Sequence, residues 1–201
     1  MRGISWWMLA VAASADAAPS PADLGQAVAD LSDKGCYALV SGAIPAAPDG
    51  ALTSAADGER FMAGLGLRFG IGQAIFDAMG PPGEAMIAQA MMGSLTLPQG
   101  NVVLATGGRQ PGCRVMLLAE PAVAVTDAVA AHITAAGWKP IPSMTAERAG
   151  VQRRAFLRRD AGGNPYLMNV MTVGTPFPGS RLRLFTTTVR IPPNVTLPEG
   201  L

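Results

Sequence analysis

Histidine is almost absent from this 201-residue chain, which contains His132 alone. Zinc sites draw their ligands from clustered histidine, cysteine and carboxylate side chains, so no metal site and no cofactor are predicted. The chain also lacks a Cys-x-x-Cys pair, a Gly-x-Ser-x-Gly elbow and a phosphate-loop lysine, which argues against those redox, hydrolase and nucleotide-binding classes. His132 is predicted to be a packing residue at a helix boundary. The eleven methionines leave copper(I) binding as an alternative, but methionine more often fills cores.

Long apolar runs are missing outside the first residues of the chain. Ile4 to Ala15 form a short run behind the positive charge of Arg2, and Ala15-Asp16-Ala17 has the small-x-small pattern of a cleavage site. This run is too short to span a bilayer, which takes about 20 residues. The pattern predicts a signal peptide at 1–17 and an exported protein, periplasmic or secreted, with no transmembrane segment after cleavage. The alternatives are an uncleaved anchor or a buried core helix.

Cysteine is limited to Cys36 and Cys113, which lie 77 residues apart. An even number of cysteines in an oxidising compartment predicts a disulfide bond between them. The alternative is a pair of separate buried thiols. A disulfide closing a loop of this length would stabilise the fold by about 4 kcal/mol in the chain-entropy model.

Charged residues make up only 14% of the chain, against 49% hydrophobic residues, so disorder is not expected. The net charge of +1 is the sum of −5 over residues 1–100 and +6 over 101–201. Arginine suits carboxylate and phosphate ligands. One hypothesis is therefore a basic face made of Arg154, Arg158, Arg181 and Arg183. The favoured alternative is a solvated sheet face that partly complements the acidic first half.

The apolar spacing predicts a largely helical first half and a strand-rich second half. Ser20-Pro21-Ala22-Asp23 has the residues of a helix start, and that helix either ends at Gly35 or continues through 36–40. Gly137 is predicted to end a helix and to let Trp138 contact Ile133. Further helices are predicted at 59–66, 84–92 and 122–136, and strands at 102–106, 114–119, 151–159, 166–173 and 181–191.

The apolar residues of the last predicted strand do not all fall on the same face. Leu182 and Leu184 should face the core, whereas Phe185, Val189 and Ile191 suit the other face, so a bulge is expected near Phe185. Short connections favour antiparallel pairing. The expected fold is therefore α+β, one antiparallel sheet of about five strands with helices packed on one face, formed by a single domain over 18–201 with a loose tail from about 192.

Four stretches resemble landmarks of a known group of proteins: "GC" at 35–36, "FMAGLGLRFG" at 61–70, "NVVLATGGRQPGCRVML" at 101–117 and "GWKP" at 137–140. In these stretches the chain is similar to uncharacterised exported proteins of alphaproteobacterial type. The resemblance covers most of the mature chain, and it implies neither an activity nor any site residue.

The leading functional hypothesis is a non-enzymatic binding or interaction domain at the cell envelope. Its partner would be an anionic envelope component or a protein, and nucleic acid is not expected. An alternative is a hydrolase-type enzyme whose site is assembled from dispersed polar residues, which a deep cleft with converging polar groups would favour. A structural envelope protein is the third possibility, and a large exposed apolar patch would favour it.

Overall fold

The structure is a computed structural model, and it describes residues 20–43, 60, 62–69, 90–97, 100–107, 113–118, 123–148, 150–174 and 182–197. The predicted signal peptide at 1–17 and Arg181 lie outside the described residues. Among the helices that are described, none is both long and apolar enough to cross a membrane.

The described strands form one antiparallel sheet, as the sequence predicts. The strand order is β1-β2-β3-β4-β9-β8-β7-β5, and the short strand β6 also pairs with β7. Six of these strands are long: β2 (Ala90–Leu97), β3 (Gly100–Gly107), β4 (Cys113–Leu118), β7 (Val151–Arg159), β8 (Pro165–Val173) and β9 (Leu184–Arg190). The short strands are β1 (Arg68–Phe69), β5 (Lys139–Pro140) and β6 (Ala146–Arg148).

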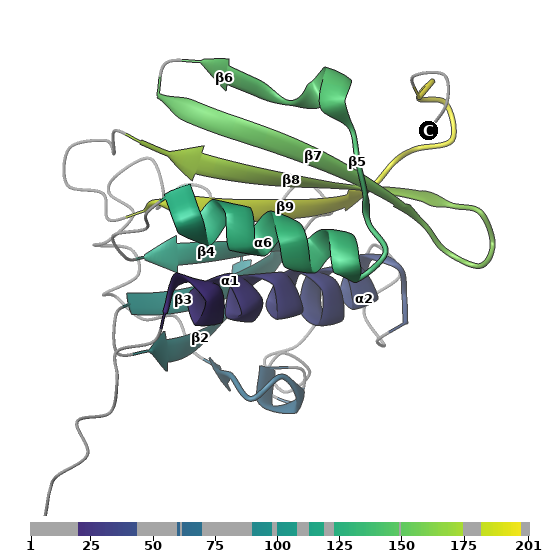
Figure 1. Cartoon of the computed structure of the whole chain (residues 1–201). Coiled ribbons are helices and arrows are strands. Elements are labelled where there is room, and N and C mark those ends of the chain that lie inside the picture. The colour runs from purple at the N-terminus through teal and green to yellow at the C-terminus, as the bar shows by residue number, and fades with distance from the viewer. Residues whose placement is uncertain are drawn as a thin grey trace, which may run out of the picture.

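Helices cover one face of the sheet, which confirms the expected α+β architecture. Helices α1 (Pro21–Asp30) and α6 (Val123–Ala135) lie side by side across the strands (Figure 1). They approach closely because a glycine, Gly25, faces Ala128 at their contact. The π-helix η1 (Leu31–Tyr37) and the short α2 (Ala38–Val40) prolong α1 along the same layer.

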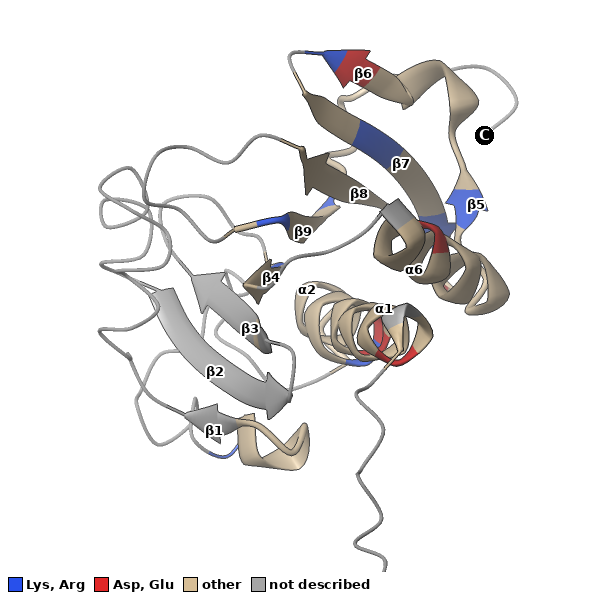
Figure 2. Ribbon diagram, turned by 60° about the vertical axis from the view of Figure 1, so that its left-hand side comes forward, with Lys and Arg blue, Asp and Glu red and all other residues tan. Residues whose placement is uncertain are grey.

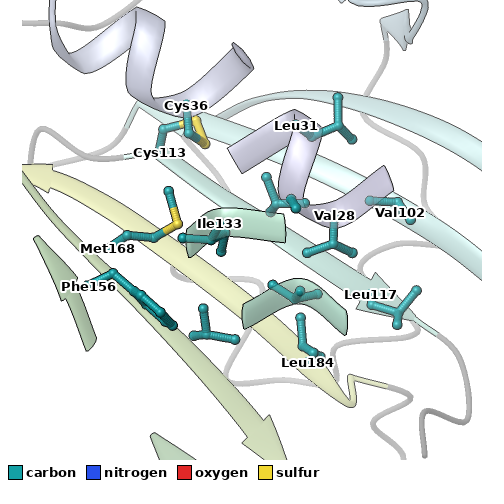
Figure 3. Close-up of a cluster of buried hydrophobic side chains, with 14 of the residues drawn as sticks. Val28, Leu31, Cys36, Val102, Cys113, Leu117, Ile133, Phe156, Met168 and Leu184 are labelled. Atoms are coloured by element: carbon teal, nitrogen blue, oxygen red, sulfur yellow. A yellow bond between two sulfur atoms is a disulfide. The ribbon is translucent and has the colours of Figure 1, made fainter. Parts of the chain in front are cut away.

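The main core lies between this helix layer and the sheet. Val28, Ile133, Phe156, Met168 and Leu184 are each at most 3% exposed and come from helices and strands that are distant in sequence (Figure 3). Alternate residues of β7 and β8 supply the sheet side of the core, as the two-residue period of a strand requires. Burying this apolar surface is the main stabilising contribution to the fold.

The predicted helix start at Ser20 is confirmed by a capping box. The Ser20 hydroxyl accepts from the Asp23 backbone N–H at 3.3 Å, and the Asp23 carboxylate accepts from the Ser20 N–H at 2.8 Å. At the other end the helix continues past Gly35, the second of the two predicted outcomes. It does so as a seven-residue π-helix, followed by α2.

Two predictions about secondary structure are wrong. Residues 90–92, predicted to end a helix, begin β2, which pairs with β3 over eight residues. The expected bulge near Phe185 is absent, because β9 keeps an unbroken register with both β4 and β8. Buried threonines, Thr186 and Thr188, take the helix-facing positions after Leu184, and so Phe185 and Val189 alternate to the opposite face.

A second, smaller apolar cluster lies on the opposite face, near the edge of the sheet. Ile141, Ala155, Leu157 and Ile191 are buried there, and Leu197 packs against them. The described part of the predicted loose tail therefore contacts the domain at Leu197. The short edge strands β5 and β6 lie along β7, and edge coverage of this kind protects a sheet from unwanted strand pairing.

Candidate functional site

Asp33 lies at the centre of a polar and aromatic cluster between the helix layer and the sheet. Its Oδ1 atom accepts from Trp138 Nε1 at 2.8 Å and from Arg158 Nη1 at 2.6 Å. The Asp33 and Arg158 side chains are only 20% and 30% exposed. Because both donors converge on one oxygen of a half-buried carboxylate, this ion pair is held more firmly than a surface pair.

Tyr37 forms the aromatic centre of the same cluster. Its ring meets the rings of Trp138 and Tyr166 edge to face, with centroids 5.3 and 5.1 Å away. The Arg158 guanidinium carbon lies 4.4 Å from the Tyr37 ring centroid, a cation–π contact. Arg158 is therefore restrained by a carboxylate and an aromatic ring together.

Local backbone structure places these side chains. Gly137 adopts a positive φ of 93°, the Trp138 N–H donates to the Ile133 carbonyl at 3.2 Å, and the Gly137 N–H donates to the Thr134 carbonyl at 3.0 Å. These two bonds define the Schellman end that the sequence predicts, and they turn Trp138 into the core. Asp33 and Tyr37 both lie on the π-helix, a geometry that is frequent at functional sites.

The β7–β8 turn continues the polar network. The Asp160 carboxylate accepts from the Asn164 backbone N–H at 2.9 Å, from the Asn164 side chain at 2.8 Å and from the Tyr166 hydroxyl at 3.0 Å. These bonds, above all the one from the Asn164 side chain, lower the pKa of Asp160. Burial, followed by the bond to Asp160, raises the pKa of Tyr166. Arg190 Nη2 completes the turn by donating to Asn164 Oδ1 at 2.7 Å.

The predicted disulfide joins Cys36 and Cys113, with Cα atoms 5.1 Å apart. Both cysteines are fully buried, and Cys36 lies next to Tyr37 on the π-helix. The bond therefore ties the segment that carries Asp33 and Tyr37 to the centre of the sheet (Figure 3). Its place in the core indicates a structural cross-link, because reactive cysteines need solvent access.

The donors and acceptors of this cluster are largely satisfied by one another. Asp33 holds Trp138 and Arg158, and Asp160 holds Asn164 and Tyr166. A catalytic group needs a nucleophile or a substrate within hydrogen-bond reach. The arrangement instead suits a structural role, in which the cluster holds the helix layer to the sheet.

A groove of roughly 360 Å³ lies between α6 and the β7 edge of the sheet. One wall is α6, and the other is formed by β7, β5 and the segment leading into β6. Its lining combines small and apolar side chains with two hydroxyls and one cation, from Ala130, Ala131, Thr134, Pro140, Thr145, Arg154, Ala155 and Phe156. The groove is open to solvent, and its volume is near the lower end for small-ligand sites.

Arg154 is the charged residue in this lining. Its Nη2 donates to Asp127 Oδ1 on α6 at 2.6 Å, and the two side chains are 32% and 59% exposed. Figure 2 shows the negative charge on α6 and the positive charge on β7. An exposed pair of this kind contributes about 0–1 kcal/mol to stability.

The described members of the predicted basic face, Arg154, Arg158 and Arg183, do not share one solvent-facing surface. Arg154 and Arg158 lie on the helix-covered face of β7, where their partners are Asp127 and Asp33. Strand alternation places Arg183, just before β9, on the face opposite to the buried Leu184. Arg181 lies outside the described residues. The premise of a common face is therefore wrong for Arg154 and Arg158 relative to Arg183, and anion binding stays a prediction.

The remaining candidates contribute little to a site. His132 lies half-buried on α6 and is not part of the groove lining. Within the described ranges, no group of three or more histidine, cysteine, aspartate or glutamate side chains could hold a metal ion. No protein-family model, curated protein or solved structure matches this chain.

Sequence reasoning did not single out Asp33, Tyr37, Asp127, Asp160 or Tyr166. The Asp33 contacts to Trp138 and Arg158 span 105 and 125 residues, so no local pattern could reveal them. Asp160 had a usable signal, because it lies in the short segment between the predicted strands 151–159 and 166–173, and aspartate often bonds to the backbone of its own turn. The pairing of Asp127 with Arg154 follows only from the packing of α6 onto β7.

Proposed function

We propose that this chain is an exported protein, periplasmic or secreted, that acts as a non-enzymatic binding domain at the cell envelope. The observation that carries the proposal is the disulfide between Cys36 and Cys113. Disulfides persist in oxidising compartments and are rare in the cytosol. The signal-peptide pattern at 1–17 and the resemblance to exported alphaproteobacterial proteins support the same location.

The groove beside α6 supports binding more than hydrolysis. It is open, whereas catalytic sites commonly exclude water around the reacting groups. Its Thr134 hydroxyl donates to the Ala130 carbonyl of its own helix at 2.8 Å, and its Arg154 is paired with Asp127. Neither arrangement resembles a nucleophile held by a base. A shallow surface with one cation and small side chains suits recognition of a partner.

Intact-mass measurement of protein recovered from the exported fraction tests the proposal. We expect a mature amino terminus within a few residues of Ala18, together with a mass that shows the oxidised cysteine pair and no alkylation of native protein. Replacing Ala15 and Ala17 with phenylalanine should leave the leader attached, because the small-x-small site is then lost. Replacing Ala10 with phenylalanine is the matched control and should still be processed. A full-length chain in the cytosolic fraction with two alkylatable thiols would overturn the proposal.

A further inference from the structure

Arg154 and Arg158 lie on the same face of β7, four residues apart, but their surroundings differ. Arg158 is held by Asp33, whose carboxylate also binds Trp138, and it stacks on Tyr37. Arg154 makes a single contact with Asp127, whose side chain is 59% exposed. An incoming anion can therefore replace the partner of Arg154 much more readily than that of Arg158.

We propose that the groove beside α6 binds a short acidic peptide segment, whose carboxylate takes the place of Asp127 on Arg154. This inference rests on the binding function proposed above. A guanidinium can bind a carboxylate through two parallel N–H bonds, whereas the contact with Asp127 uses one nitrogen and one oxygen. A bidentate ligand would thus gain a bond that the resident pair does not make.

The groove lining favours a peptide over a free carboxylate. Thr134 lies on the α6 wall and Thr145 on the opposite wall, and their hydroxyls donate to the carbonyls of Ala130 and Ile141. Each hydroxyl oxygen keeps acceptor capacity, because a hydroxyl has two lone pairs. A peptide backbone offers N–H donors to both oxygens, and a simple carboxylate offers none.

The apolar lining and the charges agree with the same occupant. Ala130 and Ala131 are small enough for a backbone to approach α6 closely, and Pro140, which is exposed, can contact short side chains. Arg154 is the cation of this lining, and once Asp127 is displaced it complements an acidic side chain of the segment.

Fluorescence anisotropy with mature, oxidised protein tests this inference. The probe is a labelled, acetylated peptide of alternating alanine and aspartate, and its control is the same peptide with asparagine. We expect the acidic peptide to bind at least about 10-fold more tightly, since hydrogen bonds to charged groups are the stronger kind. Equal binding of the two peptides, or no binding at millimolar concentration, would overturn the inference.

Three variants locate the site. Arg154→Gln should weaken binding of the acidic peptide by about 10-fold or more, and Asp127→Asn should strengthen it severalfold by removing the internal competitor. Arg148→Gln removes an exposed arginine of β6 outside the groove, so it should change affinity by less than about twofold. Unchanged affinity in Arg154→Gln, or no gain in Asp127→Asn, contradicts the assignment.

Two further measurements separate other ligands from a peptide. Acetate should compete only weakly, and vesicles of phosphatidylglycerol should not bind in an Arg154-dependent way. Strong competition by acetate, or Arg154-dependent vesicle binding without peptide binding, would overturn the peptide as the occupant. Protein that is processed and oxidised in the exported fraction but binds no acidic peptide would refute this inference and leave the exported location intact.

Discussion

Arg158 Nη1 lies 2.6 Å from Asp33 Oδ1, although the two residues are 125 positions apart in the chain. This ion pair joins the π-helix to β7, and Trp138 shares the same carboxylate oxygen. It therefore connects three separate parts of the fold at one atom.

Asp33→Asn should destabilise the protein by about 2 kcal/mol, because it weakens two hydrogen bonds to a half-buried charge. Asp127→Asn is the matched control, since it breaks an exposed aspartate–arginine pair on the same face, and it should cost less than about 1 kcal/mol. Urea denaturation of both variants measures the difference. Equal losses would show that the Asp33 cluster is no stronger than a surface pair.

The protein should lose stability at alkaline pH through Tyr166. Burial and the bond to Asp160 raise the pKa of Tyr166 in the folded state above its unfolded value of about 10. The contribution of the protonated Tyr166 hydroxyl to the free energy of unfolding is therefore fully present below about pH 10, and it is lost as the pH rises through the folded pKa. Urea midpoints between pH 8 and about pH 11 measure this slope. Tyr166→Phe should reduce the slope, and an unchanged slope would assign the loss to other groups.

Gly25→Ala should destabilise the contact between α1 and α6. A Cβ atom at Gly25 would lie 2.5 Å from the Cβ of Ala128, and overpacking of this kind costs about 1–3 kcal/mol. The direction of the change in stability is informative, because alanine normally stabilises a helix interior by about 1 kcal/mol relative to glycine. Gly64→Ala, at a helical position with open space around it, is the control and should not destabilise. Thermal melting compares them, and a rise in Tm for Gly25→Ala would contradict the close approach.

Removing the disulfide should cost about 4 kcal/mol, given a closed loop of 77 residues. The double variant Cys36→Ala, Cys113→Ala tests this by urea denaturation under oxidising conditions. Native wild-type protein should resist alkylation and mild reductant, because both cysteines are fully buried. Rapid reduction of folded protein would show that the bond is accessible.

The sequence predicted most of the elements of the second half. Strand 151–159 matches β7 at both ends, and helix 122–136 matches α6 within one residue at each end. These segments combine clear periodicity with strong local stop signals such as Gly137. By contrast, "AMMG" at 90–93 contains good helix formers, and its pairing with β3 overrides that local preference.

The candidate site was less accessible to prediction. The disulfide was predicted from the cysteine count and the expected oxidising compartment, and the bond itself is confirmed. The predicted common face is wrong for Arg183 relative to Arg154 and Arg158, because alternation tells which residues of one strand share a face, but not which face the helices cover. Only the packing of η1 and α6 onto β7 shows that Asp33 pairs with Arg158 and that Asp127 pairs with Arg154.

The position of β9 has a consequence for how the chain folds. It is the last of the described strands in sequence, yet it lies inside the sheet between β4 and β8. The Ser32 hydroxyl of the π-helix meets Thr186 of β9 at 2.7 Å across a separation of 154 residues. Contacts this remote in sequence slow folding, because a long loop must close before they form. The side of η1 that faces the sheet is therefore completed only after the carboxyl-terminal segment has been made, and until then it is a natural binding surface for chaperones.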